Sequence, residues 1–258
     1  MKRPKVLILR SPGTNCDVET ANAFELAEGE PELIHVNELR TGRKKLADYA
    51  IVVLPGGFSY GDDVSAGRVL ANEVRLHLKD LRSFIRSGRP VLGVCNGFQV
   101  LVKAGVLPQT KTDEQIASFT YNDSNRFESR WVRLRINTHS NCIFTKGLPE
   151  MIELPVAHGE GKFVVKSPKV LDDLKRTNAI ALRYVNEGGE VAGYPYNPNG
   201  SVFGIAALTN PLGNCMGIMP HPERFITRWH HPNWTRQTFH KEGVGLEMLR
   251  NAVRHVAS

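Results

Sequence analysis

The chain has 258 residues, of which 41% are hydrophobic and 23% charged, values typical of a soluble globular protein. Lysine and arginine outnumber aspartate and glutamate by 33 to 26, giving a formal charge of +7, but no basic run interleaved with aromatic residues suggests a nucleic-acid interface. The four cysteines are widely scattered and form no C-x-x-C pair, which argues against a zinc site and against a small disulfide framework.

A short apolar stretch follows the basic first five residues. It covers only residues 6–9, whereas a membrane span needs about 20 apolar residues and a signal peptide also needs a longer core. The sequence therefore predicts a cytosolic protein that does not contact membranes.

Short apolar runs, rich in leucine and β-branched residues, recur through the first hundred residues and predict strands buried on both faces of a sheet. These predicted strands are 6–9, 33–36, 51–54 and 91–94. Helices are predicted between them, at 17–27 after a cap signal from Asn15 and Asp17, at 69–86 before Gly88, and at 97–104 before Gly105. Alternating strands and helices of this kind predict a parallel, doubly wound sheet.

The pattern changes after residue 105. A polar loop is predicted at 109–128, and the alternating residues of 131–136 and 152–157 predict antiparallel strands that are covered on one face. Further predicted strands are 180–185, 202–207 and 215–219, and a final amphipathic helix carries Leu246, Leu249, Val253 and Val256 on one stripe. The predicted architecture is an α/β fold with a mostly parallel sheet and an antiparallel extension, in one domain over residues 1–258.

Cys95 lies where a buried strand runs into a helix, with Gly93 and Gly97 two positions to either side. This is the thiol counterpart of the G-x-S-x-G nucleophile elbow, where small flanking residues permit a sharp turn. The start of a helix stabilises a thiolate through its dipole and free N–H groups, and a nearby imidazole can pair with the thiolate. We therefore expect Cys95 to be a catalytic nucleophile.

The other cysteines have weaker settings. An isolated cysteine at a strand end is usually a small buried packing residue, which is the expectation for Cys142 and Cys215. Cys16 also precedes a helix and is the rival nucleophile, although no glycine frame surrounds it.

His221 is the best candidate for a general base among the nine histidines. It follows a predicted strand, and Pro222 favours extended geometry at the residue before it. In an extended segment residues two apart face the same side, so Glu223 would lie beside the imidazole and orient it. Alone, such a string is more often a turn with a salt-bridged glutamate, but with the elbow it predicts a triad of Cys95, His221 and Glu223.

A glycine-rich stretch at 55–63 follows another predicted buried strand, at the edge where open α/β sheets bind ligands. By analogy with elbow hydrolases, we assign the oxyanion hole to the backbone N–H groups of Gly57 and Asn96. The pattern of a phosphate-binding loop is absent.

Two further histidine segments are notable. His158-Gly159-Glu160-Gly161 follows a predicted strand and is a candidate to line the same site. His230 and His231 lie among aromatic and polar residues and are expected in a surface loop. No spacing in the chain is typical of metal ligands, so no metal site is predicted.

With these residues in view, the chain resembles the class I glutamine amidotransferases, and within that class the glutaminase subunits of purine biosynthesis. The class features are Cys-x-Gly-x-Gln at Cys95 and His-x-Glu at His221, while Gly-Gly-Phe-Ser-Tyr-Gly-Asp and His-Gly-Glu-Gly are more specific. Segments similar to the family span nearly the whole chain, at 12–17, 55–62, 93–99, 122–131, 157–163, 199–206 and 219–224.

The resemblance implies a flavodoxin-like fold, a Cys95 nucleophile assisted by His221 and Glu223, and Gln99 near the substrate glutamine. It implies no cofactor in this chain, because ATP and magnesium would bind a partner synthetase, joined in many organisms by a small third subunit. Residues 226–243 look like an insertion relative to compact members.

Two other classes stay open at this stage. A free-standing cysteine hydrolase of the protease, deglycase or γ-glutamyl hydrolase type would share the elbow, and constitutive turnover by the isolated chain would favour it. A binding subunit without activity would keep the fold, but the intact set of Cys95, His221 and Glu223 argues against it.

Overall fold

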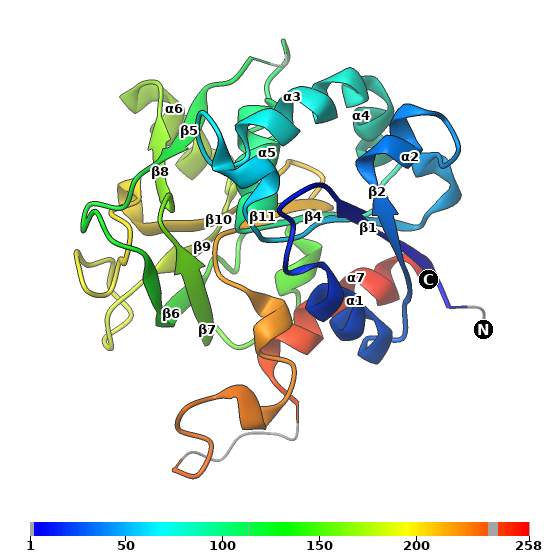
Figure 1. Ribbon diagram of the computed structural model, residues 1–258. Coiled ribbons are helices and arrows are strands. Elements are labelled where there is room, and N and C mark those ends of the chain that lie inside the picture. The colour runs from blue at the N-terminus through cyan, green and yellow to red at the C-terminus, as the bar shows by residue number, and fades with distance from the viewer. Residues whose placement is uncertain (1–2, 113, 237–241, 258) are drawn as a thin grey trace.

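The structure is a computed structural model that describes residues 3–112, 114–236 and 242–257 (Figure 1). Its centre is a nine-stranded sheet, in the order β2 (Glu30–His35), β1 (Lys5–Arg10), β3 (Ile51–Leu54), β4 (Val91–Val94), β11 (Cys215–Ile218), β10 (Ile205–Thr209), β9 (Ile180–Tyr184), β6 (Glu128–Ile136) and β7 (Met151–His158). The first five strands run parallel, and the next four pair antiparallel. The predicted fold class is confirmed.

Helices cover both faces of the parallel part of the sheet (Figure 1). The helices α1 (Asp17–Leu26) and α7 (Val244–Ala257) lie on one face, and α3 (Arg68–Leu76), α4 (Leu78–Arg86) and α5 (Asn96–Lys103) lie on the other. Every residue of β3 and β4 is buried. This explains why these strands are continuous apolar runs without a polar alternation.

The predicted helix over 69–86 is wrong in one respect, because the segment forms two helices, α3 and α4. The break is at His77, whose backbone has φ −108° and ψ 13°. The N–H of His77 bonds to the carbonyl of Val74, three residues back, and so closes a tighter last turn. Neither proline nor glycine marks the position, so the sequence carries no local signal for the break.

The predicted loop over 109–128 is also wrong in part. It contains the strand β5 (Ala117–Thr120), which pairs antiparallel with β8 (Lys162–Val165) in a separate two-stranded sheet. A four-residue strand whose partner is some 45 residues away has little local pattern of its own. The strand β8 and the helix α6 (Pro168–Arg176) were not predicted, although Pro168 in the first turn is a helix-start signal.

Smaller differences concern element ends and direction. Val36, predicted in a strand, begins the short helix α2 (Val36–Arg40). The strand predicted at 202–207 begins only at Ile205, after a 3₁₀ turn. Cys16, and not Asn15 or Asp17, occupies the N-cap position of α1, and it makes no side-chain cap bond. The strand β11 joins the parallel part of the sheet beside β4.

The register of the central strands fixes where the candidate residues meet. Gly93 of β4 lies opposite Leu54 of β3 and opposite Gly217 of β11, so these three parallel strands end at one edge. The segments that follow them carry Gly57, Cys95 and His221. Ligand sites in open α/β sheets lie at this edge.

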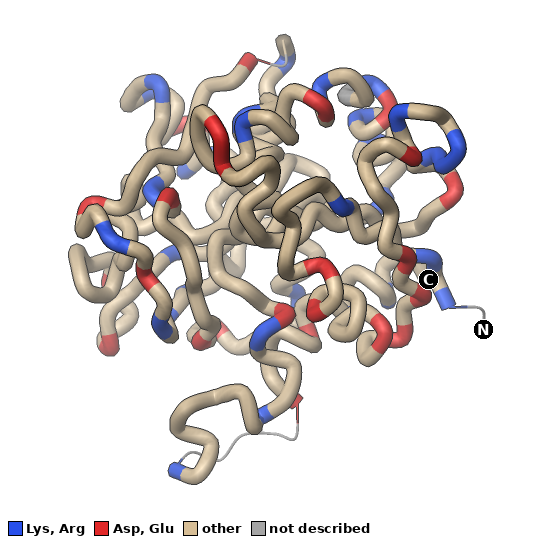
Figure 2. Tube along the Cα trace, in the orientation of Figure 1, with Lys and Arg blue, Asp and Glu red and all other residues tan. Residues whose placement is uncertain are grey.

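Figure 2 shows basic and acidic residues interspersed along the chain. None of the helices in the described ranges is long and apolar enough to cross a membrane.

Candidate active site

The turn that carries Cys95 is strained in the way the elbow pattern predicts. Cys95 has φ 49° and ψ −104°, a region that residues other than glycine rarely adopt. A Cβ added to Gly97 would lie 1.8 Å from the carbonyl oxygen of Leu54, and one added to Gly93 would lie 2.7 Å from the carbonyl oxygen of Gly97. Gly97 is therefore required by the close approach of α5 to β3, and Gly93 by the close approach of α5 to β4.

Cys95 contacts two other strands at the edge of the sheet. Its backbone N–H donates to the carbonyl of Ile218 in β11 at 2.7 Å. Its Sγ lies 3.6 Å from the carbonyl oxygen of Ala157 in β7. The strand β7 belongs to the antiparallel extension, so both halves of the sheet contribute to the site.

His221 and Glu223 form a buried pair. Nδ1 of His221 donates to Oε1 of Glu223 at 2.6 Å, and the two residues are 1% and 2% exposed. The other imidazole nitrogen, Nε2, is buried and has no hydrogen-bond partner among the described residues. Burial alone would lower the pKa of His221, but the Glu223 carboxylate and the neighbouring Cys95 thiol raise this pKa well above its usual value.

The pair forms by a different route from the one predicted. His221 has extended geometry, with φ −106° and ψ 93°, as Pro222 favours. Glu223, however, lies in a single 3₁₀ turn, Pro222–Arg224, and not in a continuing strand. The turn folds the carboxylate back onto the imidazole, so the predicted neighbours meet without the predicted alternation.

Cys16 also lies beside the base, which the sequence did not indicate. A Cβ added to Gly56 would be 3.0 Å from Sγ of Cys16 and 2.9 Å from Cε1 of His221. The Cys16 thiol donates to Oδ1 of Asn15 at 3.2 Å and accepts from Nη2 of Arg224 at 3.3 Å. Burial raises the pKa of Cys16, and it has ordinary backbone angles, so this thiol is less suited than Cys95 to attack a substrate.

Four side chains here have atoms of the kinds that bind metals. Cys16, Glu19, His221 and Glu223 place these atoms within 4.8 Å of one another. Glu223 already accepts from His221, and Nε of Arg224 donates to Glu19 at 2.9 Å. The guanidinium supplies the positive charge of this set, so the arrangement argues against a metal site.

The Gly56-Gly57 turn is held by residues 12–16. Gly57 has φ +142°, and a Cβ there would lie 2.8 Å from the backbone nitrogen of Asn15. The N–H of Phe58 donates to the carbonyl of Gly13 at 2.9 Å, and that of Cys16 donates to Gly56 at 3.3 Å. The geometry of this turn thus depends on residues 12–16, the segment that contains the rival nucleophile Cys16.

Asn96 opens α5, so its N–H is one of the first-turn donors that have no acceptor within the helix. Its side chain accepts from the N–H of Ser59 at 3.4 Å. Gln99 is buried, and its Nε2 donates to the carbonyl of Glu160 at 2.7 Å. The structure therefore brings the predicted site residues Asn96 and Gln99 together with the His158-Gly159-Glu160-Gly161 segment.

His158 is a buried neutral histidine. Burial lowers its pKa to about 4, with a further contribution from the charge of His221. Its Nε2 lies 3.3 Å from Nδ2 of Asn199, which donates to the unprotonated nitrogen. Its carbonyl accepts from Nδ2 of Asn122 at 2.8 Å, so His158 supports the segment after β7.

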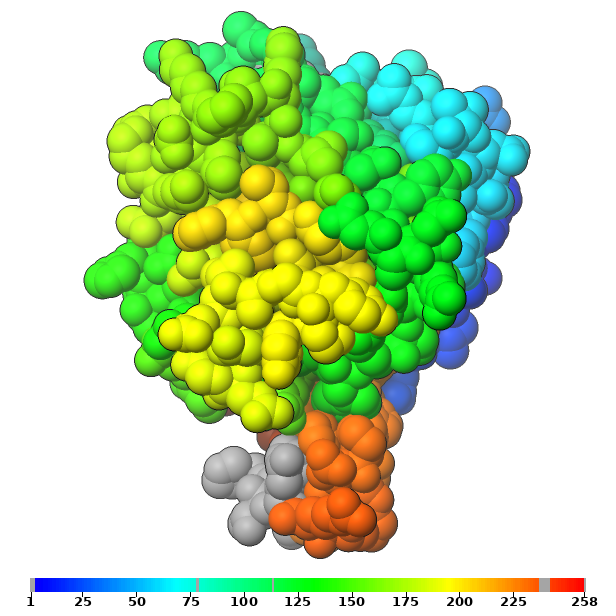
Figure 3. All heavy atoms as spheres, turned by 90° about the vertical axis from the view of Figure 1, so that its left-hand side faces the viewer, coloured from blue at the N-terminus to red at the C-terminus, as the bar shows by residue number. Residues whose placement is uncertain are grey.

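His231 contradicts the expectation of a surface loop. It is 2% exposed, its Nε2 lies 3.0 Å from Oε2 of Glu153, and its ring packs edge-to-face on Trp131. The chain turns back over β6 and β7 at this point, which buries the imidazole. His230 is exposed as expected. The described residues that follow project from the body of the molecule, and 237–241 lie outside the described ranges (Figures 1 and 3).

Cys142 and Cys215 are fully buried packing residues, as predicted. Burial raises the pKa of both thiols, and Sγ of Cys142 lies 3.4 Å from the sulfur of Met216.

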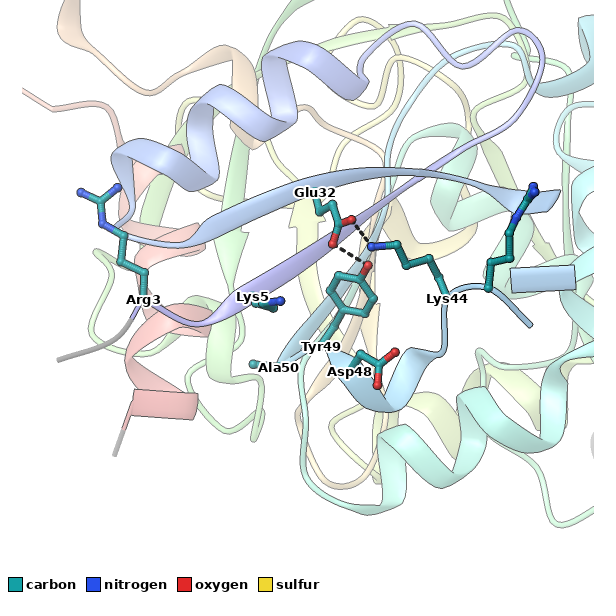
Figure 4. Close-up of a pocket in the computed structure, with 8 residues that line it drawn as sticks. Arg3, Lys5, Glu32, Lys44, Asp48, Tyr49 and Ala50 are labelled. Atoms are coloured by element: carbon teal, nitrogen blue, oxygen red, sulfur yellow. Dashed lines mark hydrogen bonds and ion pairs between the residues drawn. The ribbon is translucent and has the colours of Figure 1, made fainter. Parts of the chain in front are cut away.

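A cavity of about 650 Å³ lies at the opposite edge of the sheet, beside the start of β1 (Figure 4). The carboxylate of Glu32 lies among its lining residues and accepts two hydrogen bonds, one from Tyr49 at 2.6 Å and one from Lys44. Arg3 points away from this group (Figure 4). The described residues that line the cavity include neither cysteine nor histidine, and none of them belongs to the Cys95 site.

The chain is similar to known glutamine amidotransferases. Residues 3–256 match the family described as CobB/CobQ-like glutamine amidotransferase domain. The chain is 47% identical over 255 residues to phosphoribosylformylglycinamidine synthase subunit PurQ of Dehalococcoides mccartyi, covering 98% of each chain. It is 44% identical over 241 residues to the subunit of that name in Treponema denticola, covering 87% of this chain and 89% of the relative.

Solved structures show the same fold. A chain of PurLQS from Thermotoga maritima superposes with a TM-score of 0.74 at 27% identity, covering 99% of this chain and all of the other. The glutaminase domain of CTPS from Trypanosoma brucei superposes with a TM-score of 0.57 at 15% identity over 97% of this chain, which shows likeness of fold alone. The chain belongs to the CobB/CobQ-like glutamine amidotransferase family.

Proposed function

We propose that the chain is the glutaminase subunit of phosphoribosylformylglycinamidine synthase, and that Cys95, His221 and Glu223 hydrolyse glutamine for it. The observation that carries the catalytic assignment is the strained backbone of Cys95 at the start of α5, beside the buried His221–Glu223 pair. The relatives named PurQ support the identity of the synthase.

The reaction begins with attack of the Cys95 thiolate on the side-chain carboxamide carbon of glutamine. The resulting tetrahedral oxyanion is stabilised by the N–H groups of Gly57 and Asn96. Imidazolium at His221 donates a proton to the departing nitrogen, ammonia leaves, and a γ-glutamyl thioester remains on the sulfur. His221 then takes a proton from water, which attacks the thioester and releases glutamate.

Glu223 acts on His221 and not on the substrate. Its carboxylate holds the imidazole with Nδ1–H toward Glu223 and Nε2 toward the reacting atoms, and it stabilises the imidazolium form. The raised pKa of His221 agrees with this role.

Ammonia passes to a partner synthetase, which binds ATP and magnesium and aminates formylglycinamide ribonucleotide. A small third subunit joins the complex, and the reaction takes place in the cytoplasm. The chain itself uses no cofactor in this scheme.

The Gly56-Gly57 turn is the proposed gate. Glycine peptides rotate at low cost, and only one orientation of the Gly57 N–H serves the oxyanion. Docking of the synthetase would favour that orientation and so raise turnover. The segment from Arg224 to Lys241 is the proposed docking surface; its described part exposes Trp229 and Trp234, and 237–241 lie outside the described residues.

The test is glutamate release by the purified chain, measured with and without synthetase, ATP and formylglycinamide ribonucleotide. The proposal predicts slow release by the chain alone and faster release in the complete mixture. High, constant release that the synthetase does not change would contradict it and favour a free-standing cysteine hydrolase.

A further inference from the structure

Asp62 is hydrogen-bonded to the residue that follows the nucleophile. Asn96, which follows Cys95, donates from Nδ2 to Oδ1 of Asp62 at 3.2 Å and to Oε1 of Gln99 at 3.0 Å. Asp62 ends the 3₁₀ segment Ser59–Asp62 and has φ 56°. Left-handed backbone is unfavourable for a residue with a side chain, so the surrounding structure holds this carboxylate in place at an energetic cost.

A second carboxylate approaches from the segment after β7. The carbonyl of Glu160 accepts from Gln99 at 2.7 Å, and its Oε2 accepts from the N–H of Ala66 at 3.1 Å. Lys103 of α5 donates to the carbonyl of Ala66 at 2.6 Å, and its Nζ lies 3.9 Å from Oε2 of Glu160. These contacts tie the loop after Gly57 to α5 and hold Glu160 near enough to Asp62 for the two charges to interact.

The charges around Asp62 do not balance. Burial and the charge of Glu160 raise the pKa of Asp62 to about 6, although the N–H of Gly67, the charge of Lys103 and the amide of Asn96 act to lower it. Arg68, the other nearby cation, acts on Lys103 and donates to Oε1 of Gln115 at 3.2 Å. A cationic group bound at Asp62 would therefore be stabilised, whereas an anionic group would be repelled.

We propose that the carboxylate of Asp62 binds the α-ammonium group of substrate glutamine, with Oε1 of Gln99 as a second acceptor. This assignment rests on the proposed function, because it takes glutamine as the substrate. Oε1 of Gln99 has a second lone pair that Asn96 does not use. Asp62 is then a specificity residue, which distinguishes glutamine from amides that lack an α-amino group.

The side chain of glutamine is short, so its α-ammonium group must bind close to the nucleophile. Three carbon–carbon bonds of about 1.5 Å each separate the reacting carboxamide carbon from Cα. With that carbon bonded to Sγ of Cys95, the ammonium can lie no further than one extended side chain from the nucleophile. Its charge-assisted hydrogen bond to Asp62 would be stronger than one between neutral groups.

The experiment compares glutamine with glutaramate, the same amide without the α-amino group, in the complex with synthetase. The variant is Asp62→Asn, and Asp63→Asn is the matched control, because Asp63 is an exposed neighbour that loses the same charge. Glutaramate is followed as a substrate through ammonia release, or as a competitive inhibitor of glutamine through its inhibition constant.

The expected result is a KM for glutamine about 10- to 100-fold higher in Asp62→Asn, the range for a lost hydrogen bond to a charged group. The kcat for glutamine and the binding of glutaramate should change by no more than a few-fold, and Asp63→Asn should resemble the wild type. Equally weaker binding of glutamine and glutaramate, or a lower kcat with unchanged KM, would show that Asp62 only supports the loop after Gly57. An unchanged KM for glutamine would also overturn the proposal. Absence of glutaminase activity in the wild-type complex would instead contradict the proposed function.

Discussion

Nδ1 of His221 and Oε1 of Glu223 are 2.6 Å apart, in a pair with almost no access to solvent. A buried carboxylate attracts a nearby imidazolium with little screening by solvent, so the protonated form of His221 is favoured. Because the pKa of His221 is raised, this stabilisation is present at low and neutral pH and is lost as pH rises through the folded-state value.

Replacement of Glu223 by glutamine should reduce turnover while leaving glutamine binding nearly unchanged. The amide keeps the shape but removes the charge that stabilises imidazolium. The kcat should fall by at least about tenfold and at most about 10⁴-fold, the loss in the serine-triad template. Steady-state kinetics check this, with Glu19→Gln as the control carboxylate that does not bond to His221. Wild-type kcat in Glu223→Gln would remove Glu223 from the mechanism.

Gly97 should tolerate no larger residue. In Gly97→Ala the new Cβ would meet the carbonyl oxygen of Leu54, so α5 must shift and Cys95 with it. We expect a loss of roughly 1–3 kcal/mol in the free energy of unfolding, together with lost activity. Gly193→Ala is the control, since a Cβ there has open space. Wild-type stability and activity in Gly97→Ala would disprove the close approach of Gly97 to Leu54.

His158 should make stability depend on acid pH. Its folded-state pKa is about 4, below the usual 6.5, so the unfolded chain takes up a proton that the native state does not. The stabilising effect of neutral His158 is complete above pH 6.5 and is lost as pH falls toward 4, by about 3 kcal/mol. Urea unfolding at pH 7.5 and 4.5 should show a smaller drop for His158→Gln than for the wild type. His139→Gln, at an exposed position, is the control. An equal drop in the free energy of unfolding in all three proteins would show that His158 is not the group responsible.

Trp229 and Trp234 should contribute to the affinity for the synthetase. They are 55% and 42% exposed, and their ring centroids are 4.8 Å apart. Exposed tryptophans are frequent interface anchors, and a central one contributes about 2 kcal/mol or more, so we expect at least a tenfold weaker complex when both are alanine. Binding titrations measure this, with the exposed Tyr196→Ala as the control. Unchanged affinity would exclude this surface and leave the triad unaffected.

Local patterns predicted the strands at the active-site edge well. The runs 51–54 and 91–94 coincide with β3 and β4, because strands covered on both faces must be continuously apolar. The glycine frame of Cys95 was readable for a similar reason, since a tight turn against Leu54 excludes side chains.

Features that depend on distant contacts could not be predicted. Whether the helix over 69–86 breaks at His77 is decided by packing, and the pairing of β5 with β8 joins segments far apart in the chain. The same limit hid the place of Cys16 beside His221 and the burial of His231. Each of these requires the fold to bring the partners together.

The most direct test of the account is the rate of glutamate release by Cys95→Ala and Cys16→Ala in the complex with synthetase. The thiolate of Cys95 forms the thioester and no neighbouring group replaces it, so Cys95→Ala should release no glutamate, while synthesis driven by added ammonia continues. Cys16→Ala should still hydrolyse glutamine, because its thiol is held by Asn15 and Arg224 and takes no part in bond formation. Glutamate release by Cys95→Ala, together with its loss in Cys16→Ala, would contradict the assignment of the nucleophile.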